Sequence, residues 1–281
     1  MVDAKDIVFT KMHGAGNDFV ILDLRRHGPP SRDLLRALSD RHTGVGCDQI
    51  LGIEAPRSSS AVASYRIWTA DGSPSQQCGN GARCVAAWLL KSGTAKEPSF
   101  LLDSPTRTHN VDTVSEGVFQ VGMGLPDFHP SSLPMEGFPS EKFHYETYLD
   151  PFPPQRFFAL SVGNPHAVVV VPDIDDARVA EIGPMLQRSS HLPRDVNVGF
   201  VQVMSPIHVR LRVYEYGAGE TLACGSGACA AVASLIRCGR VDREVKVQMK
   251  GGDLSVSWPN ETDEILMSGP AKFVFEGVFI G

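Results

Sequence analysis

The sequence predicts an α+β fold of two pseudo-symmetric halves, each a mixed sheet wrapped around one central helix. Three observations predict it. A segment of the first half recurs in the second. Each copy runs into an alanine-rich helix that is apolar almost all round, as buried helices are. A proline-rich stretch at 126–155 separates the copies. We therefore expect one domain at 1–125, joined by a C-terminal strand at 268–281, and a second domain at 126–267.

The repeat aligns two segments without a gap. RIWTADGSPSQQCGNGA, at 66–82, matches RVYEYGAGETLACGSGA, at 212–228, with an offset of 146 positions that places Cys78 on Cys224. Looser matches precede both segments: a Gly-Asn pair before an apolar run, then a side-chain amide before a second apolar run. Because the three features follow the same order at nearly the same spacing, the halves are interpreted as two copies of one structural unit.

Short runs rich in Val, Ile and Phe, bounded by Gly or Pro, predict strands. They are 7–9, 19–22, 50–53, 64–68, 157–162, 167–171, 198–204, 208–213 and 245–249. Apolar residues at helical spacing predict helices at 31–40, 82–91, 175–186 and 228–237. Ser31 is the expected N-cap of the first helix. The prolines of 126–155 predict irregular structure at the domain junction.

The composition excludes several classes of function. The formal net charge is −6 and no run of Lys or Arg stands out, so nucleic acid is not an expected partner. The apolar run 167–171 is too short to cross a membrane, and the N-terminus lacks an apolar signal segment, so we expect a cytoplasmic protein. Six cysteines without a C-x-x-C pair favour reduced thiols over disulfides or a zinc site.

Two of the cysteines stand where chemistry is favoured. Cys78 and Cys224 each come just before a predicted buried helix. The positive end of a helix dipole stabilises a thiolate, and its N–H groups bind a carboxylate. If the copies face each other across a cleft, one thiolate removes an α-proton and the opposite thiol protonates the other face. The sequence thus predicts an amino-acid racemase or epimerase that uses no metal and no other cofactor. The remaining cysteines are interpreted as structural: Cys47, Cys84, Cys229 and Cys238.

Six segments together resemble the diaminopimelate epimerase family: KMHGAGNDF, GVGCDQ, ADGSPSQQCGNGARC, GNPHAV, NVGF and YGAGETLACGSGACA. The resemblance spans nearly the whole chain. It implies two barrel-like domains with the substrate in the cleft between them. It also implies conversion of LL-diaminopimelate to the meso form, on the route to lysine and peptidoglycan, without pyridoxal phosphate or metal. A homodimer is expected, since Phe275 falls where the family has a Tyr at its dimer contact.

The resemblance also implies roles for individual residues. Cys78 and Cys224 match the catalytic pair, and His166 and Glu215 match residues that adjust the protonation of the thiols. Substrate contacts are implied for side-chain amides and for the residues that follow the cysteines: Asn17, Gln49, Asn164, Asn197, Gly79, Asn80, Gly225 and Ser226.

Two positions depart from the family pattern. Thr69 stands where the family has Asn, and Tyr216 stands where it has Arg. In the family both belong to the subsite for the distal end of diaminopimelate. A lost charge-assisted hydrogen bond costs about 1.5–3 kcal/mol. Thr69 and Tyr216 are therefore counted among the predicted substrate contacts. The alternative to diaminopimelate epimerisation is racemisation of a single-headed amino acid, one with no second carboxylate, for example histidine.

Three further hypotheses remain open. The related proline-type group contains hydroxyproline epimerases and a dehydratase, but a dehydratase would replace one of the two cysteines. A non-catalytic amino-acid-binding protein on the same fold is the alternative from a different class. Finally, if Cys78 and Cys224 face each other, oxidation would join them and require a reductant for full activity.

Overall fold

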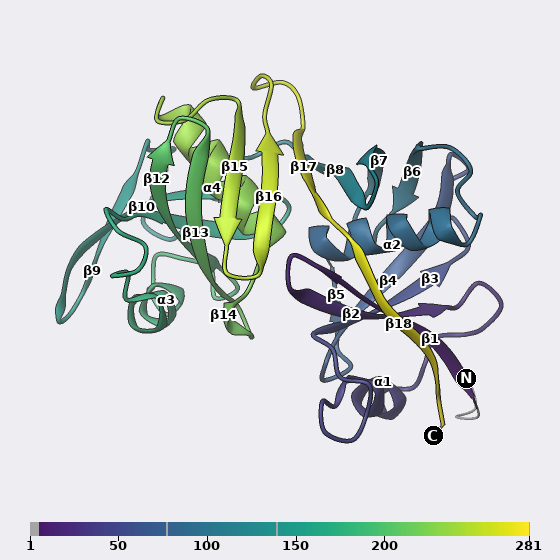
Figure 1. The fold of residues 1–281 in the computed structure, drawn as a ribbon. Coiled ribbons are helices and arrows are strands. Elements are labelled where there is room, and N and C mark those ends of the chain that lie inside the picture. The colour runs from purple at the N-terminus through teal and green to yellow at the C-terminus, as the bar shows by residue number, and fades with distance from the viewer. Residues whose placement is uncertain (1–5, 77, 139, 281) are drawn as a thin grey trace. The chain divides into compact units, whose positions relative to one another are not determined.

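The computed structural model describes residues 6–76, 78–138 and 140–280. The chain forms two compact units: unit 1 is Met1–Gly122 with Ser268–Gly281, and unit 2 is Met123–Met267. Figure 1 shows the course of the chain through both. Two strands that pair with each other, β8 (Val118–Gly124) and β17 (Ile265–Pro270), cross the boundary between the units.

Unit 1 contains a mixed sheet and two helices. Its other strands are β1 (Ile7–Gly14), β2 (Asn17–Asp23), β3 (Gln49–Glu54), β4 (Ala61–Thr69), β5 (Pro74–Ser75), β6 (Ser99–Asp103), β7 (Thr108–Ser115) and β18 (Lys272–Phe279). Its helices are α1 (Arg32–Ser39) and α2 (Gly79–Lys91).

Unit 2 has the same composition of elements. Its strands are β9 (Tyr145–Leu149), β10 (Phe152–Ser161), β11 (Pro165–Val170), β12 (Asn197–Ser205), β13 (His208–Glu215), β14 (Gly219–Thr221), β15 (Glu244–Met249) and β16 (Gly252–Ser257). Its helices are α3 (Val179–Gln187), α4 (Gly225–Arg237) and the short 3₁₀ helix η1 (Pro130–Ser132).

The two units share one series of strand pairings. In unit 1, β1–β2 is antiparallel, β2–β3 parallel and β3–β4 antiparallel, and β4 also pairs with β5 and, in parallel, with β6. In unit 2, β10, β11, β12, β13, β14 and β15 pair in the same order and with the same directions. The structure therefore confirms the pseudo-symmetric α+β fold predicted from the repeat.

In unit 1 the sheet carries a helix on each face. Leu35 and Leu38 of α1 join a buried cluster with Val20 and Leu22 of β2. Side chains alternate along a strand, so the neighbouring Phe19 points to the opposite face, where α2 packs on β1, β2 and β3. Because β2 is covered on both faces, it reads as a continuous apolar run.

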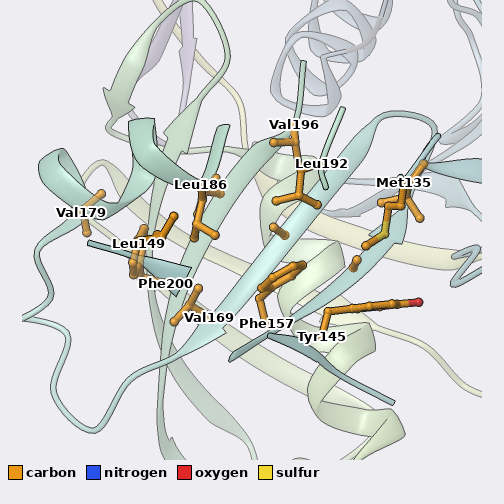
Figure 2. Close-up of a cluster of buried hydrophobic side chains, with 14 of the residues drawn as sticks. Met135, Tyr145, Leu149, Phe157, Val169, Val179, Leu186, Leu192, Val196 and Phe200 are labelled. Carbon is orange, nitrogen blue, oxygen red and sulfur yellow. The ribbon is translucent and has the colours of Figure 1, made fainter. Parts of the chain in front are cut away.

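Unit 2 repeats this layering. Figure 2 shows its core, where Leu186 of α3 lies beside Phe200 of β12 and Val169 of β11, with Phe157 of β10 further along. The buried helix α4 packs on the strands β10 to β13 and on β16. Every residue of α4 from Gly225 to Leu235 is buried, as its apolar sequence predicts.

The predicted helices are confirmed, with differences at their ends. Ser31 caps α1 through a hydrogen bond from the Leu34 amide. The helix predicted at 175–186 begins only at Val179, and Asp175 lies before it, with its carboxylate accepting hydrogen bonds from Arg210 of β13. Its Pro184 lies inside α3.

The prediction of irregular structure throughout 126–155 is wrong. This stretch contains η1, the whole of β9 and the start of β10. Pro153 and Pro154 are accommodated because the register of β10 against β9 shifts between Phe152 and Gln155. Such an irregularity releases the strand from ladder hydrogen bonds that proline cannot donate.

Candidate active site

Both cysteines occupy the N-cap of a buried helix. The Sγ atom of Cys78 accepts a hydrogen bond from the Gly81 amide at 3.3 Å, at the start of α2. The Sγ atom of Cys224 accepts one from the Gly227 amide at 3.4 Å, at the start of α4. Cys78 is half-buried and Cys224 is buried. The two thiols thus have equivalent positions within their own units, as the repeat predicts.

The last glycine of each Cys-Gly-x-Gly motif lies directly against the sulfur. A Cβ atom on Gly227 would approach Cys224 Sγ to 3.2 Å and Val213 Cγ2 to 3.0 Å. A Cβ atom on Gly81 would meet Cys78 Sγ at 3.4 Å and Leu51 Cδ2 at 3.1 Å. All four distances are shorter than, or at the lower limit of, ordinary van der Waals contacts of a Cβ atom. The glycines therefore let the helix start close to the thiol.

The residues predicted to form the N–H cradle occupy the first turns of these helices. Gly79 and Asn80 follow Cys78 in α2, and Gly225 and Ser226 follow Cys224 in α4. First-turn N–H groups have no acceptor within an α-helix, so they are disposed to bind an anion. Each unit therefore offers a thiol and an anion-binding helix terminus side by side.

In unit 1 the site amides surround Cys78. Asn17 Oδ1 lies 3.7 Å from Cys78 Sγ and 3.4 Å from Asn80 Nδ2. The Gln49 side chain, on the neighbouring strand β3, has a buried Oε1 atom without a hydrogen-bond partner among the described residues. A buried acceptor left without a donor is costly unless a ligand supplies one.

In unit 2 a polar cluster surrounds Cys224. Asn164 Nδ2 donates to Ser226 Oγ at 3.3 Å, and Ser226 Oγ lies 3.6 Å from Cys224 Sγ. Asn164 Oδ1 faces His166 Nε2 at 3.1 Å, an arrangement in which Nε2 carries the proton of that ring. Glu215 accepts a short hydrogen bond from the Thr221 hydroxyl.

Burial shifts the pKa values of two site residues in unit 2, His166 and Cys224. It lowers the pKa of His166 to about 3, so the ring is neutral at pH 7, and its Nδ1 has no partner among the described residues. Burial, and next the Glu215 carboxylate, raise the pKa of Cys224 well above its ordinary value. Both effects favour the protonated, thiol form of Cys224.

Three residues predicted to contact the substrate, Thr69, Asn197 and Tyr216, have the following surroundings in the structure. The Thr69 hydroxyl lies 2.5 Å from Asp71 Oδ1, within its own turn. Asn197 accepts from the Tyr216 amide at 3.0 Å and donates to a backbone carbonyl at 3.5 Å. The Tyr216 side chain is exposed. Thr69 is the last residue of β4, Asn197 is the first residue of β12, and Tyr216 directly follows β13.

Two charged residues that were not predicted as site residues, Asp48 and Arg83, contact the site amides. Asp48 contacts Asn17, and the guanidinium of Arg83, which is fully buried, contacts Asn80. Asp48 belongs to the segment GVGCDQ and Arg83 to the segment GARC, so both were within the quoted motifs. Asn17, the partner of Asp48, lies 31 positions away in the sequence, so no local pattern indicated that contact. Asn80, the partner of Arg83, lies only three positions away on the same helix, but the burial of the Arg83 charge has no local signal.

Other features of the described chain lie outside this site. A cavity of about 710 Å³ in unit 2 is lined by residues of β9, by the end of α3, and by the loop residues Phe138 and His191, but by no predicted site residue. Across residues 6–76, 78–138 and 140–280, no three His, Cys, Asp or Glu side chains are grouped to hold a metal ion. Within the same ranges, no helix has both the length and the apolar character needed to span a membrane.

Comparisons with known proteins agree with this arrangement. A family model described as diaminopimelate epimerase matches residues 9–128 and 158–274. The O-ureido-serine racemase of Streptomyces lavendulae is 57% identical over 97% of this chain and 95% of that protein. The diaminopimelate epimerase of Xanthomonas campestris pv. campestris is 56% identical over 96% and 95%. The class of this protein is thus an isomerase of the epimerase and racemase type. The chain belongs to the diaminopimelate epimerase family.

Solved structures show the same fold at much lower identity. A hydroxyproline epimerase from Agrobacterium vitis superposes with a TM-score of 0.73 at 16% identity, over 99% of this chain and 94% of that one. A probable proline racemase from Agrobacterium radiobacter gives 0.72 at 15% identity, over 96% and 92%. These likenesses bear on the fold.

Proposed function

We propose that the protein inverts one α-carbon of LL-diaminopimelate to give the meso form, with Cys78 and Cys224 as its two proton-transferring groups. One observation carries the proposal: repeat-related helices each begin at a cysteine, in a chain about 56% identical to a diaminopimelate epimerase. In this role the protein supplies meso-diaminopimelate for the synthesis of lysine and peptidoglycan.

The chemistry needs two opposed groups. One sulfur, as thiolate, takes the α-proton, and the C–H electron pair passes into the carboxylate. First-turn N–H groups of Gly79, Asn80, Gly225 and Ser226 supply the dipoles that stabilise the added negative charge. The other sulfur, as thiol, protonates the opposite face of the carbon and becomes the thiolate. After one turnover the thiol and the thiolate have changed places. Each cysteine is therefore the base in one direction of the reaction.

The neighbours of Cys224 support its part in this exchange. Glu215 interacts with the thiol, and Ser226 lies beside it. His166 is neutral and fixes the amide of Asn164. A neutral histidine next to the site can orient polar groups without adding a positive charge, which would stabilise the thiolate form of Cys224.

A second candidate, racemisation of a single-headed amino acid, rests on the two departures from the family pattern. The residues at the two departing positions, Thr69 and Tyr216, carry no charge, and Tyr216 is exposed. The distal carboxylate of diaminopimelate would lack the arginine that normally binds it. A relative at 57% identity is named O-ureido-serine racemase, and O-ureido-serine has no distal carboxylate.

The two candidates are separated by α-proton exchange. The enzyme is incubated in heavy water with LL-diaminopimelate, O-ureido-L-serine and L-histidine in separate samples, and α-deuterium is followed by NMR. The first proposal expects the highest kcat/KM for diaminopimelate. Fast exchange of O-ureido-L-serine with none of diaminopimelate would replace it with the second candidate. Binding without exchange of any substrate would overturn both.

The roles of the thiols are tested in parallel. Cys78→Ala and Cys224→Ala are each expected to lower the epimerisation rate by about 10²- to 10⁴-fold, the contribution of a positioned acid or base. Cys238→Ala is the matched control, because Cys238 is a half-buried thiol at the other end of α4. Full activity in either catalytic variant would reject the two-thiol mechanism.

We also propose that the enzyme acts as a homodimer in the cytoplasm. β18 exposes Val274, Phe275 and Val278, and Phe275 is the position that the family uses in its dimer contact. Thiols that must carry protons need a reducing compartment. Light scattering of the purified protein gives the oligomeric state directly, and Phe275→Glu is expected to shift it to the monomer.

A further inference from the structure

The carboxamide of Asn17 has different partners on its two sides. Its nitrogen, Nδ2, lies 2.8 Å from Asp48 Oδ2. Its oxygen, Oδ1, lies 3.7 Å from Cys78 Sγ and 3.4 Å from Asn80 Nδ2. An amide group can be turned by 180° without changing its shape, so its partners decide which end faces the thiol.

The partners allow one orientation. The carboxylate of Asp48 can only accept hydrogen bonds, so the NH₂ group of Asn17 must face it. At the other end, Arg83 can only donate, and its Nη2 lies 2.8 Å from Asn80 Oδ1. The NH₂ group of Asn80 therefore points to Asn17 Oδ1. A fixed anion and a buried cation thus impose the same direction on both amides.

Asp48 is itself held in place by neighbouring charges and a backbone amide. Its Oδ1 accepts from Arg41 Nη2 at 2.8 Å, and its Oδ2 also accepts from the Asp18 amide at 3.1 Å. Arg41 forms two further hydrogen bonds to the Asp18 carboxylate, which the buried ammonium of Lys11 also contacts at 2.5 Å. This arrangement fixes the position of Asp48 although about 45% of its side chain is exposed.

We propose that Asp48 is a positioning residue for the reaction: it fixes Asn17 so that the carboxamide oxygen, and not the nitrogen, faces the Cys78 thiol. The oxygen accepts the S–H proton and favours the protonated form of Cys78 in the empty site. The NH₂ group in its place would instead favour the thiolate. This inference rests on the proposed role of Cys78.

Two neighbouring groups of unit 1, Tyr65 and Cys84, keep a constant charge over the pH range of the test. Tyr65 on β4 and Cys84 on α2 interact electrostatically with Cys78. Burial raises the pKa of Cys84 to about 12 and that of Tyr65 still higher, so both are neutral between pH 6 and pH 10. The Gly81 amide favours the thiolate at every pH. The orientation of Asn17 and the charge of Asp48 are therefore the variables to test.

The test follows alkylation of Cys78 by iodoacetamide as a function of pH, with the labelled peptide quantified by mass spectrometry in the absence of substrate. Asp48→Ala and Asn17→Ala are each expected to move the midpoint of this curve to lower pH, because the thiol loses its oriented acceptor. We expect at least a threefold rise in the labelling rate at pH 7.5. Asp23→Ala is the matched control, since Asp23 is an arginine-bound aspartate at the far end of β2.

The double variant decides between orientation and simple charge. If Asp48 acts through Asn17, then Asp48→Ala has no further effect in the Asn17→Ala background. An equal shift in both backgrounds means that the charge of Asp48 acts on Cys78 directly, and the proposal is overturned. An unchanged midpoint in Asp48→Ala also overturns it. Because labelling needs no turnover, these outcomes are independent of which substrate, or whether any, is epimerised.

Discussion

Phe19 and His166 occupy the same place in the two units. Phe19 pairs with Gln49 across β2 and β3, and His166 pairs with Asn197 across β11 and β12. Both side chains are fully buried. One copy of the fold thus fills this position with an apolar ring, and the other fills it with a titratable ring bound to Asn164.

This difference predicts a pH dependence of stability. The unfolded chain protonates His166 near its ordinary pKa of 6.5, while the folded chain does so only near a pKa of about 3. The neutral ring thus stabilises the fold fully above pH 6.5, and this contribution is lost as the pH falls from 6.5 towards 3. At pH 5 the loss is about 2 kcal/mol.

Urea unfolding at pH 7.5 and pH 5.0 measures this loss. In His166→Phe the decrease in unfolding free energy between the two pH values is expected to be about 2 kcal/mol smaller than in the unmodified protein. His42→Gln, at an exposed position, serves as the control and should leave the decrease unchanged. An unchanged decrease in His166→Phe would contradict the assignment.

The close contact of Gly227 with Cys224 predicts a loss of activity without loss of the fold. In Gly227→Ala the added methyl must displace the thiol or Val213, and a displacement of about 1 Å can cost 10²-fold in rate. Gly199→Ala is the control, since its Cβ would make an ordinary contact at 3.5 Å. Exchange rates and melting temperatures of both variants are compared. A normal rate in Gly227→Ala would show that the thiol tolerates displacement.

The buried ammonium of Lys11 predicts a large effect on stability. Lys11→Met removes the buried donor that Lys11 supplies to the Gly46 carbonyl and to the half-buried Asp18 carboxylate, which keeps its hydrogen bonds from Arg41. We expect a loss of about 3 kcal/mol in unfolding free energy. Lys91→Met, which removes an exposed pair with Glu276, should cost about 1 kcal/mol or less. Equal losses in chemical denaturation would mean that the Asp18 network is not stabilising.

The two departures from the family pattern predict the direction of a substrate change. Tyr216→Arg with Thr69→Asn restores the family's residues for a distal carboxylate. If the natural substrate is single-headed, the double variant should raise kcat/KM for diaminopimelate by about 10- to 100-fold. If diaminopimelate is already the substrate, the double variant should change kcat/KM for diaminopimelate little, because the existing pocket binds its distal end. Steady-state kinetics on both substrate types distinguishes these results.

Much of the fold could be predicted because the duplicated segments carry strong local signals. The Cys-Gly-x-Gly motifs indicated both buried helices, although each begins three residues earlier than predicted, at Gly79 and Gly225. Gly93 and Gly239, with positive φ, follow the helix ends. Strand β7 was missed because its inward positions include His109 as well as Val111, so the apolar alternation is broken. His109 is nevertheless buried, with Nδ1 2.7 Å from the Gly122 carbonyl oxygen.

The site was predictable where its groups adjoin a motif, and not where they act across strands. Cys78 and Cys224 could be placed from their helices alone. The bond from Asn17 to Asp48 joins residues 31 positions apart, and it depends on the parallel pairing of β2 with β3. The partner of Arg83 follows from helical spacing, but the burial of a charged side chain in an apolar helix has no local signal.

The antiparallel pairing of β1 with β18 has a consequence for protein synthesis. The ribosome makes the whole of unit 2 before it makes the last strand of unit 1, so the sheet of unit 1 cannot be completed until the end of the chain is synthesised. Until then β1 lacks one of its two hydrogen-bonded neighbours. An incomplete chain that stops before Ser268 would therefore expose a strand able to pair with other chains, which makes truncated products of this protein prone to aggregate.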